Sequence, residues 1–359
     1  MTYEIKTLRL SRRRILMGGG ASCLVGCGTK VKIQSEKASL GGTPNKGWSS
    51  APSLPEAVQE IYPCAHKGRI HQAGGFTAKD GRIVGPTAAH HMWRPGDASW
   101  SEATPLPTAR HHPHLISFKG RLLAFAGFES TVSTPFAQGA WTIQNTGWVL
   151  DEDEGAWLDM PALPAPAAEA VVGVTGDGAL HLAGGRTWAK DGVTGGWRDH
   201  IDTDHHFVLT GISGRWERAA PCLYKRNSAA GAIIDGQFHI VGGREVGGGN
   251  VAHHSVYDSK ADSWRKAAPM PQAQGGLAAA SVGGKLYAFG GEFFDNGGGV
   301  YPQGWVYDPV RDVWSALPDM PHPRHGLGAV ELGGAIYVIG GALQASGVDS
   351  SALVEVFTP

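Results

Sequence analysis

The sequence predicts an all-β protein, a six-bladed β-propeller with four antiparallel strands in each blade. Two marks carry this prediction, because each occurs six times and they alternate along the chain with a period of about 50 residues. The first mark is a tryptophan followed by proline-rich sequence, at Trp48, Trp100, Trp157, Trp216, Trp264 and Trp314. The second is a doublet of small residues after an apolar stretch, at Gly74-Gly75, Ala126-Gly127, Gly184-Gly185, Gly242-Gly243, Gly290-Gly291 and Gly340-Gly341.

The fifth repeat shows which strands each unit contains. An apolar stretch from Leu277 to Val282 leads into Gly283-Gly284, a pair that favours a tight hairpin turn. A second apolar stretch ends at the doublet, a third begins at Trp305 after a loop, and a fourth contains the repeat tryptophan Trp314. Four such strands, repeated six times around an axis, form a propeller.

The two ends of the repeat region predict how the ring closes. The sixth doublet is followed by a late strand near residues 353–357 but by no tryptophan strand, and Trp48 has no unit before it. We therefore expect the N-terminal strand at Trp48 to complete the sixth blade, which hides two otherwise exposed strand edges. This assigns residues 47–359 to the propeller and makes residues 28–46 a linker.

Residues 1–27 resemble an export signal rather than part of the fold. Arg12, Arg13 and Arg14 precede a weakly apolar, glycine-rich stretch, as in twin-arginine signals. The alternative is a basic N-terminal tail that is not an export signal. Residues 24–27 resemble a lipobox, which implies lipidation of Cys27; the alternative is an ordinary cleavage site beside a bystander cysteine. The expected location is the periplasm, with a lipid anchor in the outer membrane, or otherwise the secreted fraction.

The amino-acid composition limits the kinds of molecule that this protein is expected to bind. The chain has 359 residues and a net charge of -1, and 42% of its residues are hydrophobic while 18% are charged. These values are typical of a packed globular protein. The near-neutral balance gives no electrostatic reason to expect nucleic acid as a partner. We expect a monomer that contacts a membrane only through the N-terminal lipid.

The tryptophan, the doublet and their spacing resemble the kelch-repeat family over residues 48–359, with Ala126 departing from the doublet in one blade. Kelch proteins include binding scaffolds, copper oxidases and sugar epimerases, so the resemblance implies a fold and leaves the function open. Copper-radical oxidases of this kind use paired tyrosines, one of them crosslinked to cysteine. Cys64, Cys222 and the available tyrosines do not assemble that set. We therefore expect no copper oxidase, no metal and no cofactor.

Residues that enter the first strand of each blade should lie at the mouth of the central channel. Sixteen residues before the doublet, blades two, four and six carry an arginine followed by a polar residue: Arg110-His111, Arg226-Asn227 and Arg324-His325. Guanidinium groups bind carboxylates and phosphates through paired hydrogen bonds, so this arrangement predicts a site for a small anion. The alternative is that these arginines bond to the carbonyl groups of neighbouring loops.

Residues that directly follow a doublet should lie on the same face and extend the site. They include Arg186, Arg244, Glu245 and Glu292, and Glu169 near the start of blade three is a further inward candidate. The glutamates can neutralise the arginines, or one of them can act as an acid or a base. All these residues are predicted to contact an acidic sugar or another small anion.

Three functions are consistent with these residues. The first is binding of an acidic small molecule or glycan without catalysis. The second follows from an architectural resemblance to periplasmic N-acetylneuraminate epimerases, the sialic acid mutarotases, and implies Glu292 as the catalytic acid or base. The arginine that this family places shortly after that glutamate is absent from the loop here. The third is a scaffold that binds a protein partner.

Overall fold

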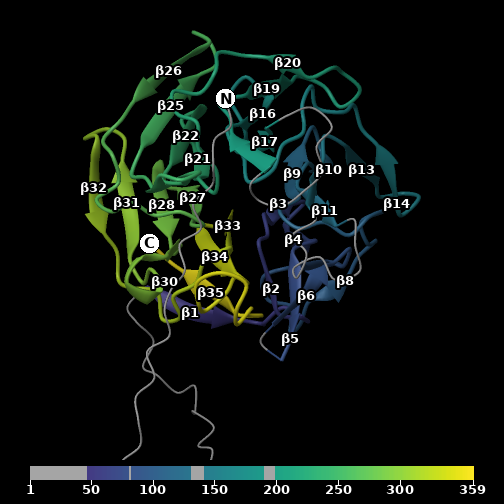
Figure 1. Ribbon diagram of the computed structural model, residues 1–359. Helices are drawn as coiled ribbons and strands as arrows, with labels where there is room; N and C mark the ends of the chain where they lie inside the picture. Colours follow the sequence, from purple (N-terminus) through teal and green to yellow (C-terminus); the bar gives the residue numbers. More distant parts are fainter. Residues whose placement is uncertain (1–46, 81, 131–140, 190–198) are drawn as a thin grey trace, which may run out of the picture. The chain divides into compact units, whose positions relative to one another are not determined.

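The computed structural model describes residues 47–80, 82–130, 141–189 and 199–359. The predicted signal at residues 1–27, with Cys27, and the predicted linker at residues 28–46 lie outside this part of the chain. The described residues contain six four-stranded antiparallel sheets, arranged as blades around a common axis (Figure 1). This confirms the six-bladed propeller that the repeats predict.

The strands of the first three blades follow in sequence order, with a two-stranded hairpin inserted between the second and third strands. Blade one consists of β3 (Cys64–His66), β4 (Arg69–Ala73), β7 (His90–Trp93) and β8 (Ser101–Glu102). Blade two consists of β9 (His114–Phe118), β10 (Arg121–Phe125), β13 (Gly147–Asp151) and β14 (Ala156–Asp159). Blade three consists of β15 (Val171–Val174), β16 (Leu180–Ala183), β19 (His206–Leu209) and β20 (Glu217–Arg218).

The last three blades repeat this order, and the sixth takes its outer strand from the N-terminal side. Blade four consists of β21 (Ala230–Ile234), β22 (Gln237–Val241), β25 (His254–Asp258) and β26 (Ser263–Lys266). Blade five consists of β27 (Ala278–Val282), β28 (Lys285–Phe289), β31 (Gly304–Asp308) and β32 (Val313–Ala316). Blade six consists of β33 (Gly328–Leu332), β34 (Ala335–Ile339), β35 (Val354–Phe357) and β1 (Trp48–Ala51).

The ring closes as predicted. Strand β1 pairs antiparallel with β35, and Trp48 lies opposite Phe357. The six repeat tryptophans are regularly spaced because each makes the same contact between blades. In every case the indole N–H donates to a carbonyl of the preceding blade. The acceptors for Trp48, Trp100, Trp157, Trp216, Trp264 and Trp314 are the carbonyls of Pro318, Pro52, Thr104, Pro161, Ala220 and Ala268.

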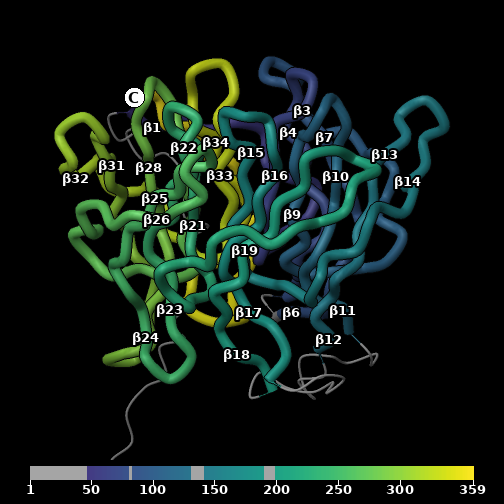
Figure 2. Tube along the Cα trace, turned by 90° about the horizontal axis from the view of Figure 1, so that it is seen from above, coloured from purple at the N-terminus to yellow at the C-terminus, as the bar shows by residue number. Residues whose placement is uncertain are grey.

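Short hairpins that follow the glycine doublets gather at one end of the ring (Figure 2). They are β5 (Phe76–Lys79) with β6 (Arg82–Pro86) and β2 (Val58–Gln59), β11 (Phe128–Ser130) with β12 (Trp141–Ile143), β17 (Arg186–Trp188) with β18 (His200–Asp202), β23 (Arg244–Glu245) with β24 (Gly249–Asn250), and β29 (Glu292–Phe293) with β30 (Gly299–Val300). A 3-10 turn, η2 (Asp295–Gly297), lies within the last hairpin. We call this end the hairpin face.

The doublets need glycine because neighbouring blades approach there closely. At Gly290 the backbone has φ of +67°, and a Cβ atom would lie 2.2 Å from the carbonyl oxygen of Arg324. At Gly341 φ is +92°, and a Cβ atom would lie 2.6 Å from the carbonyl oxygen of His325. Glycine adopts positive φ without a steric penalty, so the doublet fixes where the next blade begins.

Three blades contain a buried pair of histidines between their second and third strands. The pairs are His71–His90, His181–His206 and His239–His254, with Nδ1 to Nε2 distances of 3.0, 2.9 and 2.9 Å. The second histidine of each pair donates its Nδ1–H to a backbone carbonyl, at Thr104, Ala220 and Ala268. A carbonyl only accepts, so Nδ1 of the second histidine carries a proton. Burial lowers the pKa of both histidines in each pair, which favours the neutral rings, with Nε2 of the second histidine as the acceptor.

Among the described residues, no three His, Cys, Asp or Glu side chains converge so that they could hold a metal ion. No helix in the described ranges is long and apolar enough to span a membrane.

Candidate functional site

A ring of backbone hydrogen bonds surrounds the axis on the hairpin face. One residue from each blade has a left-handed φ between 49° and 71°, namely Glu60, His112, Glu169, Ser228, Gly276 and Gly326. The N–H of five of them bonds to the carbonyl of the equivalent residue in the preceding blade, at distances of 2.6 to 3.1 Å. Positive φ is uncommon in residues other than glycine, so the closure of the ring imposes this conformation on the four larger residues.

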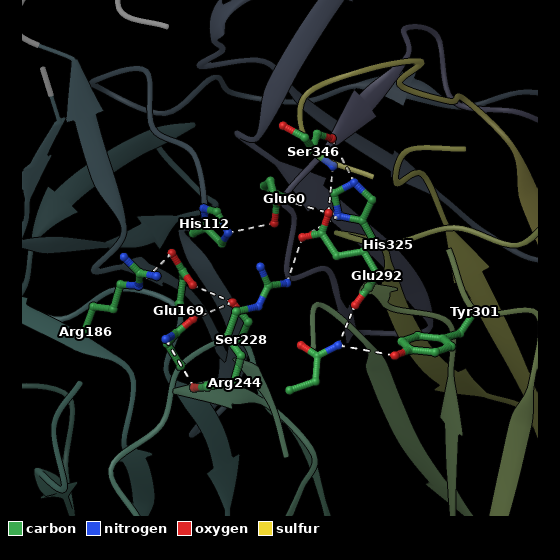
Figure 3. Close-up of polar contacts among 12 residues, drawn as sticks. Glu60, His112, Glu169, Arg186, Ser228, Arg244, Glu292, Tyr301, His325 and Ser346 are labelled. Carbon is green, nitrogen blue, oxygen red and sulfur yellow. Dashed lines mark hydrogen bonds and ion pairs between the residues drawn. The ribbon is translucent and has the colours of Figure 1, made fainter. Parts of the chain in front are cut away.

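The ring directs these four side chains into a cavity of about 200 Å³, which we call the axial pocket. Arg186, Arg244 and Glu292, the first residues after three of the doublets, reach into it from β17, β23 and β29, and His325 completes its charged lining (Figure 3). The two glycines of the ring, Gly276 and Gly326, have no side chain and leave space for these charged side chains. A Cβ atom at Gly276 would lie 3.0 Å from Nη2 of Arg244.

Glu60 and His112 form an ion pair, with 2.7 Å between Oε2 and Nε2. Burial favours a higher pKa for the Glu60 carboxyl, but His112, His325 and Arg244 outweigh it and lower that pKa to about 2. Burial favours a lower pKa for His112, but the Glu60 carboxylate outweighs it and raises that pKa. The pocket therefore holds a carboxylate beside an imidazolium near neutral pH.

Glu169 and Glu292 each neutralise one arginine. Oε1 of Glu169 lies 3.4 Å from Nε of Arg186, and its other oxygen accepts the Ser228 hydroxyl. Burial favours a higher pKa for Glu169, but Arg186 and His112 lower it. Nη2 of Arg244 donates to Oε1 of Glu292 at 2.7 Å.

The second imidazole of the axial pocket is that of His325. Its Nε2 lies 2.9 Å from the carbonyl oxygen of Ser346, so Nε2 is the donor. Its Nδ1 lies 3.5 Å from Oε1 of Glu292 and 3.7 Å from Oε1 of Glu60, and it has no hydrogen bond within the described residues. In the neutral ring this nitrogen carries a lone pair, and a proton taken up there would face two carboxylates.

Comparison with known proteins agrees with the propeller fold. The kelch motif matches residues 275–321. The Kelch-like protein terF of Aspergillus terreus is 27% identical over 221 residues, which cover 58% of this chain and 45% of that protein. This chain thus aligns with less than half of that relative's length. The solved structure of YjhT superposes with a TM-score of 0.71 at 15% identity, over 87% of this chain and 97% of the other.

The chain folds as a kelch-type β-propeller. In this kelch propeller, the predicted lining of the channel mouth by three arginines is wrong, and the alternative holds. Arg110, Arg226 and Arg324 are at most 4% exposed and lie inside their blades. Each donates to the carbonyl of the first doublet residue, at Ala126, Gly242 and Gly340. Gln274 does the same to Gly290 in blade five, so this position satisfies a buried carbonyl.

The structure separates the other predicted residues into two groups. Glu169, Arg186, Arg244, Glu292 and His325 line the axial pocket, and their contact with a ligand stays a prediction. Three residues do not line it. His111 is stacked between Phe76 and Phe128, Asn227 donates to Asp202 and to the Arg244 carbonyl, and Glu245 lies 3.7 Å from His253.

Sequence reasoning missed Glu60, His112 and Ser228 as pocket residues. A signal for them exists, because each stands fourteen residues before its doublet, two positions after the one that we counted. In blade three the equivalent residue, Glu169, stands fifteen residues before the doublet. The first hairpin of that blade is one residue longer, which hides the equivalence.

Proposed function

We propose that this kelch propeller binds a sugar, neutral or bearing one carboxylate, in the axial pocket. The observation that carries the proposal is the convergence of three carboxylates, two guanidinium groups and two imidazoles on one cavity of about 200 Å³. Each sugar hydroxyl group can donate one hydrogen bond and accept up to two. They match a wall in which Glu60, Glu169 and Glu292 accept while Arg186 and Arg244 donate.

The charge balance restricts the ligand further. The two arginines and the His112 imidazolium offset the three glutamates, so the pocket is close to neutral overall. A strongly anionic ligand is therefore disfavoured, since both arginines already face a carboxylate. A sugar with a single carboxylate can bind by accepting hydrogen bonds from the guanidinium groups of Arg186 and Arg244, which line the pocket.

A second candidate function is interconversion of the anomers of that sugar. Nε2 of His112 and Nδ1 of His325 lie 2.7 and 3.7 Å from the carboxylate of Glu60, so two imidazoles that can give or take a proton flank one carboxylate. Mutarotation needs a base that takes the proton of the anomeric hydroxyl and an acid that protonates the ring oxygen as the ring C–O bond breaks. Reclosure on the other face of the carbonyl reverses both transfers.

This geometry changes the role that the sequence suggested for Glu292. Both of its carboxylate oxygens are already hydrogen-bonded, one to Arg244 and the other to the Ser346 N–H at 2.7 Å. We therefore assign the base to His325, and we assign to Glu292 the role of holding that ring and stabilising its protonated form.

Freshly dissolved N-acetylneuraminate and glucose are expected to reach anomeric equilibrium faster with the purified protein than without it, as followed by proton NMR. In His325→Gln the amide N–H stands at the level of Nε2 and can donate to the Ser346 carbonyl, but the base is lost, so the acceleration should fall by about 10²- to 10⁴-fold. Glu245→Gln, on the same face but outside the pocket, is the matched control and should leave the rate unchanged.

The same experiment separates the two functions. Broadened sugar signals without faster equilibration would support binding alone and exclude the mutarotase. Absence of both effects, with either sugar, would overturn the proposal that the axial pocket takes a sugar.

We also propose that the protein is exported and lipid-anchored through Cys27, which rests on the sequence of residues 1–27 alone. In a bacterial host the wild type is expected in the membrane fraction with an acylated N-terminus, and Cys27→Ala is expected in the soluble fraction. Cys64→Ser is the control, because Cys64 is buried within the propeller. A wild-type protein without lipid by mass spectrometry would contradict the anchor.

A further inference from the structure

A second cavity, of about 410 Å³, opens between blades one and two, far along the strands from the hairpin face. Its floor is the His71–His90 pair, and Arg69, Arg94 and Leu150 are among its walls. Arg94 directly follows β7, and the other residues belong to β4, β7 and β13, which lie together on one side of the ring (Figure 2). We call this the interblade cavity.

The same place is filled between blades three and four. The ring of Tyr257 lies over His206, with 4.5 Å between centroids and an interplanar angle of 87°. Its hydroxyl donates to Oδ1 of Asp262 at 2.7 Å, and the same oxygen accepts the backbone N–H of Ala220 at 2.8 Å.

The space between blades four and five is filled in the same way. Tyr307 lies over His254 at 4.5 Å and 82°. Its hydroxyl donates to Asp312 at 2.6 Å, and that carboxylate accepts the N–H of Ala268 at 2.8 Å. An aromatic ring and a carboxylate therefore cover the histidine pair at both places.

Blade two lacks both groups. It carries Leu150 where the tyrosines stand and Gly155 where the aspartates stand. The backbone is the same, because Gly155 has φ of +64° while Asp262 and Asp312 have φ of 44° and 54°. The N–H of Thr104, which corresponds to those of Ala220 and Ala268, has no hydrogen-bond partner within the described residues.

The interblade cavity also has basic residues at two positions that are uncharged or acidic in blades three and four. Arg69 and Arg94 stand where blade three has Ala179 and Thr210 and where blade four has Gln237 and Asp258. Neither arginine has a carboxylate partner among the described residues, whereas Lys67 is paired with Glu152 at 2.6 Å. Glu152, the carboxylate that lines the cavity, is thus taken up by Lys67 and His66. Arg69, which donates to Met92 Sδ, and Arg94 are left without a carboxylate of their own in the described part of the chain.

We propose that the interblade cavity binds a small aromatic carboxylate, which supplies the ring and the carboxylate that the repeat omits here. The aromatic ring lies against His90, in the position of Tyr257 and Tyr307. The carboxylate accepts the Thr104 N–H and pairs with Arg69 and Arg94. The volume lies in the range of cavities that hold small molecules. This site is separate from the axial pocket and independent of the proposed sugar function.

Benzoate and 4-hydroxyphenylacetate are the probes, with benzyl alcohol as the neutral control, measured by calorimetry and ligand-detected NMR on the full protein. Both carboxylates should bind, and benzyl alcohol should bind at least about tenfold more weakly because it lacks the charge-assisted hydrogen bonds. Arg69→Gln with Arg94→Gln should weaken the carboxylates by at least about tenfold. Arg265→Gln, an exposed arginine on blade four, is the matched control and should change nothing.

The decisive variant is Leu150→Tyr with Gly155→Asp, which introduces into blade two the tyrosine and the aspartate that blades four and five have at these positions. A Cβ atom at Gly155 would meet only Thr104 Oγ1, at 3.8 Å, so the variant should fold. It should abolish binding of both probes while its melting temperature stays at or above that of the wild type. Undiminished binding to this variant, or no binding of either carboxylate to the wild type at millimolar concentration, would overturn the proposal.

Discussion

Replacing Arg324 by methionine is expected to lower the free energy of unfolding by about 3–5 kcal/mol. Arg324 is fully buried, and its Nη1 donates to Oε2 of Glu355 at 2.7 Å. Its Nε and its other nitrogens satisfy the carbonyls of Gly340, His322 and Val338. The substitution leaves the 4% exposed Glu355 carboxylate without its guanidinium partner, and such a buried charge is costly.

Urea unfolding of three variants tests this explanation. Arg324→Met with Glu355→Leu removes both charges and should recover more than half of the lost stability. Arg311→Ala, on an exposed turn of blade five, should change stability by less than about 0.5 kcal/mol. If Arg324→Met lowered the free energy of unfolding by no more than Arg311→Ala does, the structural role assigned to Arg324 would be wrong.

Lowering the pH from 6.5 to 4.5 is expected to unfold the kelch propeller through its three buried histidine pairs. Burial lowers the pKa from the ordinary 6.5 to about 3 for His71 and His239, and to about 4 for His90, His181 and His254. In this window the unfolded chain binds protons that the folded chain excludes, so stability falls as the pH falls.

The expected size of this effect is large. Counting one proton for each pair, the free energy of unfolding falls by up to about 4 kcal/mol per pH unit below pH 6.5. Domains are stable by about 5–15 kcal/mol, so a fall of this size exceeds the lower end of that range within about two pH units. His112 acts in the opposite sense, because its raised pKa adds stability that is lost as the pH rises. It contributes a single proton and does not cancel the three pairs.

Blade five supplies the matched variant for this prediction. It carries Tyr287 and Gly304 at the positions of His239 and His254. His239→Tyr with His254→Gly should therefore reduce the pH slope by at least about one proton, or about 1.4 kcal/mol per pH unit, as measured by urea unfolding at several pH values. His253→Gln alters a partly exposed neighbour and should leave the slope unchanged. An unaltered slope in the double variant would show that acid acts through other groups.

The sequence by itself determined the architecture of this protein. The tryptophans and the doublets predict six blades and their closure at Trp48, because each mark performs one local task that every blade repeats. A tryptophan bonds to the preceding blade, and a glycine doublet permits the positive φ at which the next blade begins. Residues that make the same contact in every blade recur at a fixed spacing, so the number of blades can be counted from the sequence.

The tertiary structure alone decided which polar residues meet. Arg324 and His325 are adjacent in sequence, yet one turns into the blade to satisfy carbonyl groups and the other faces the axial pocket. The interblade cavity likewise depends on Leu150 and Gly155 facing a histidine pair of another blade. A periodic pattern specifies where the backbone goes. The direction of each side chain depends on which buried donors and acceptors its neighbours in other blades leave unpaired.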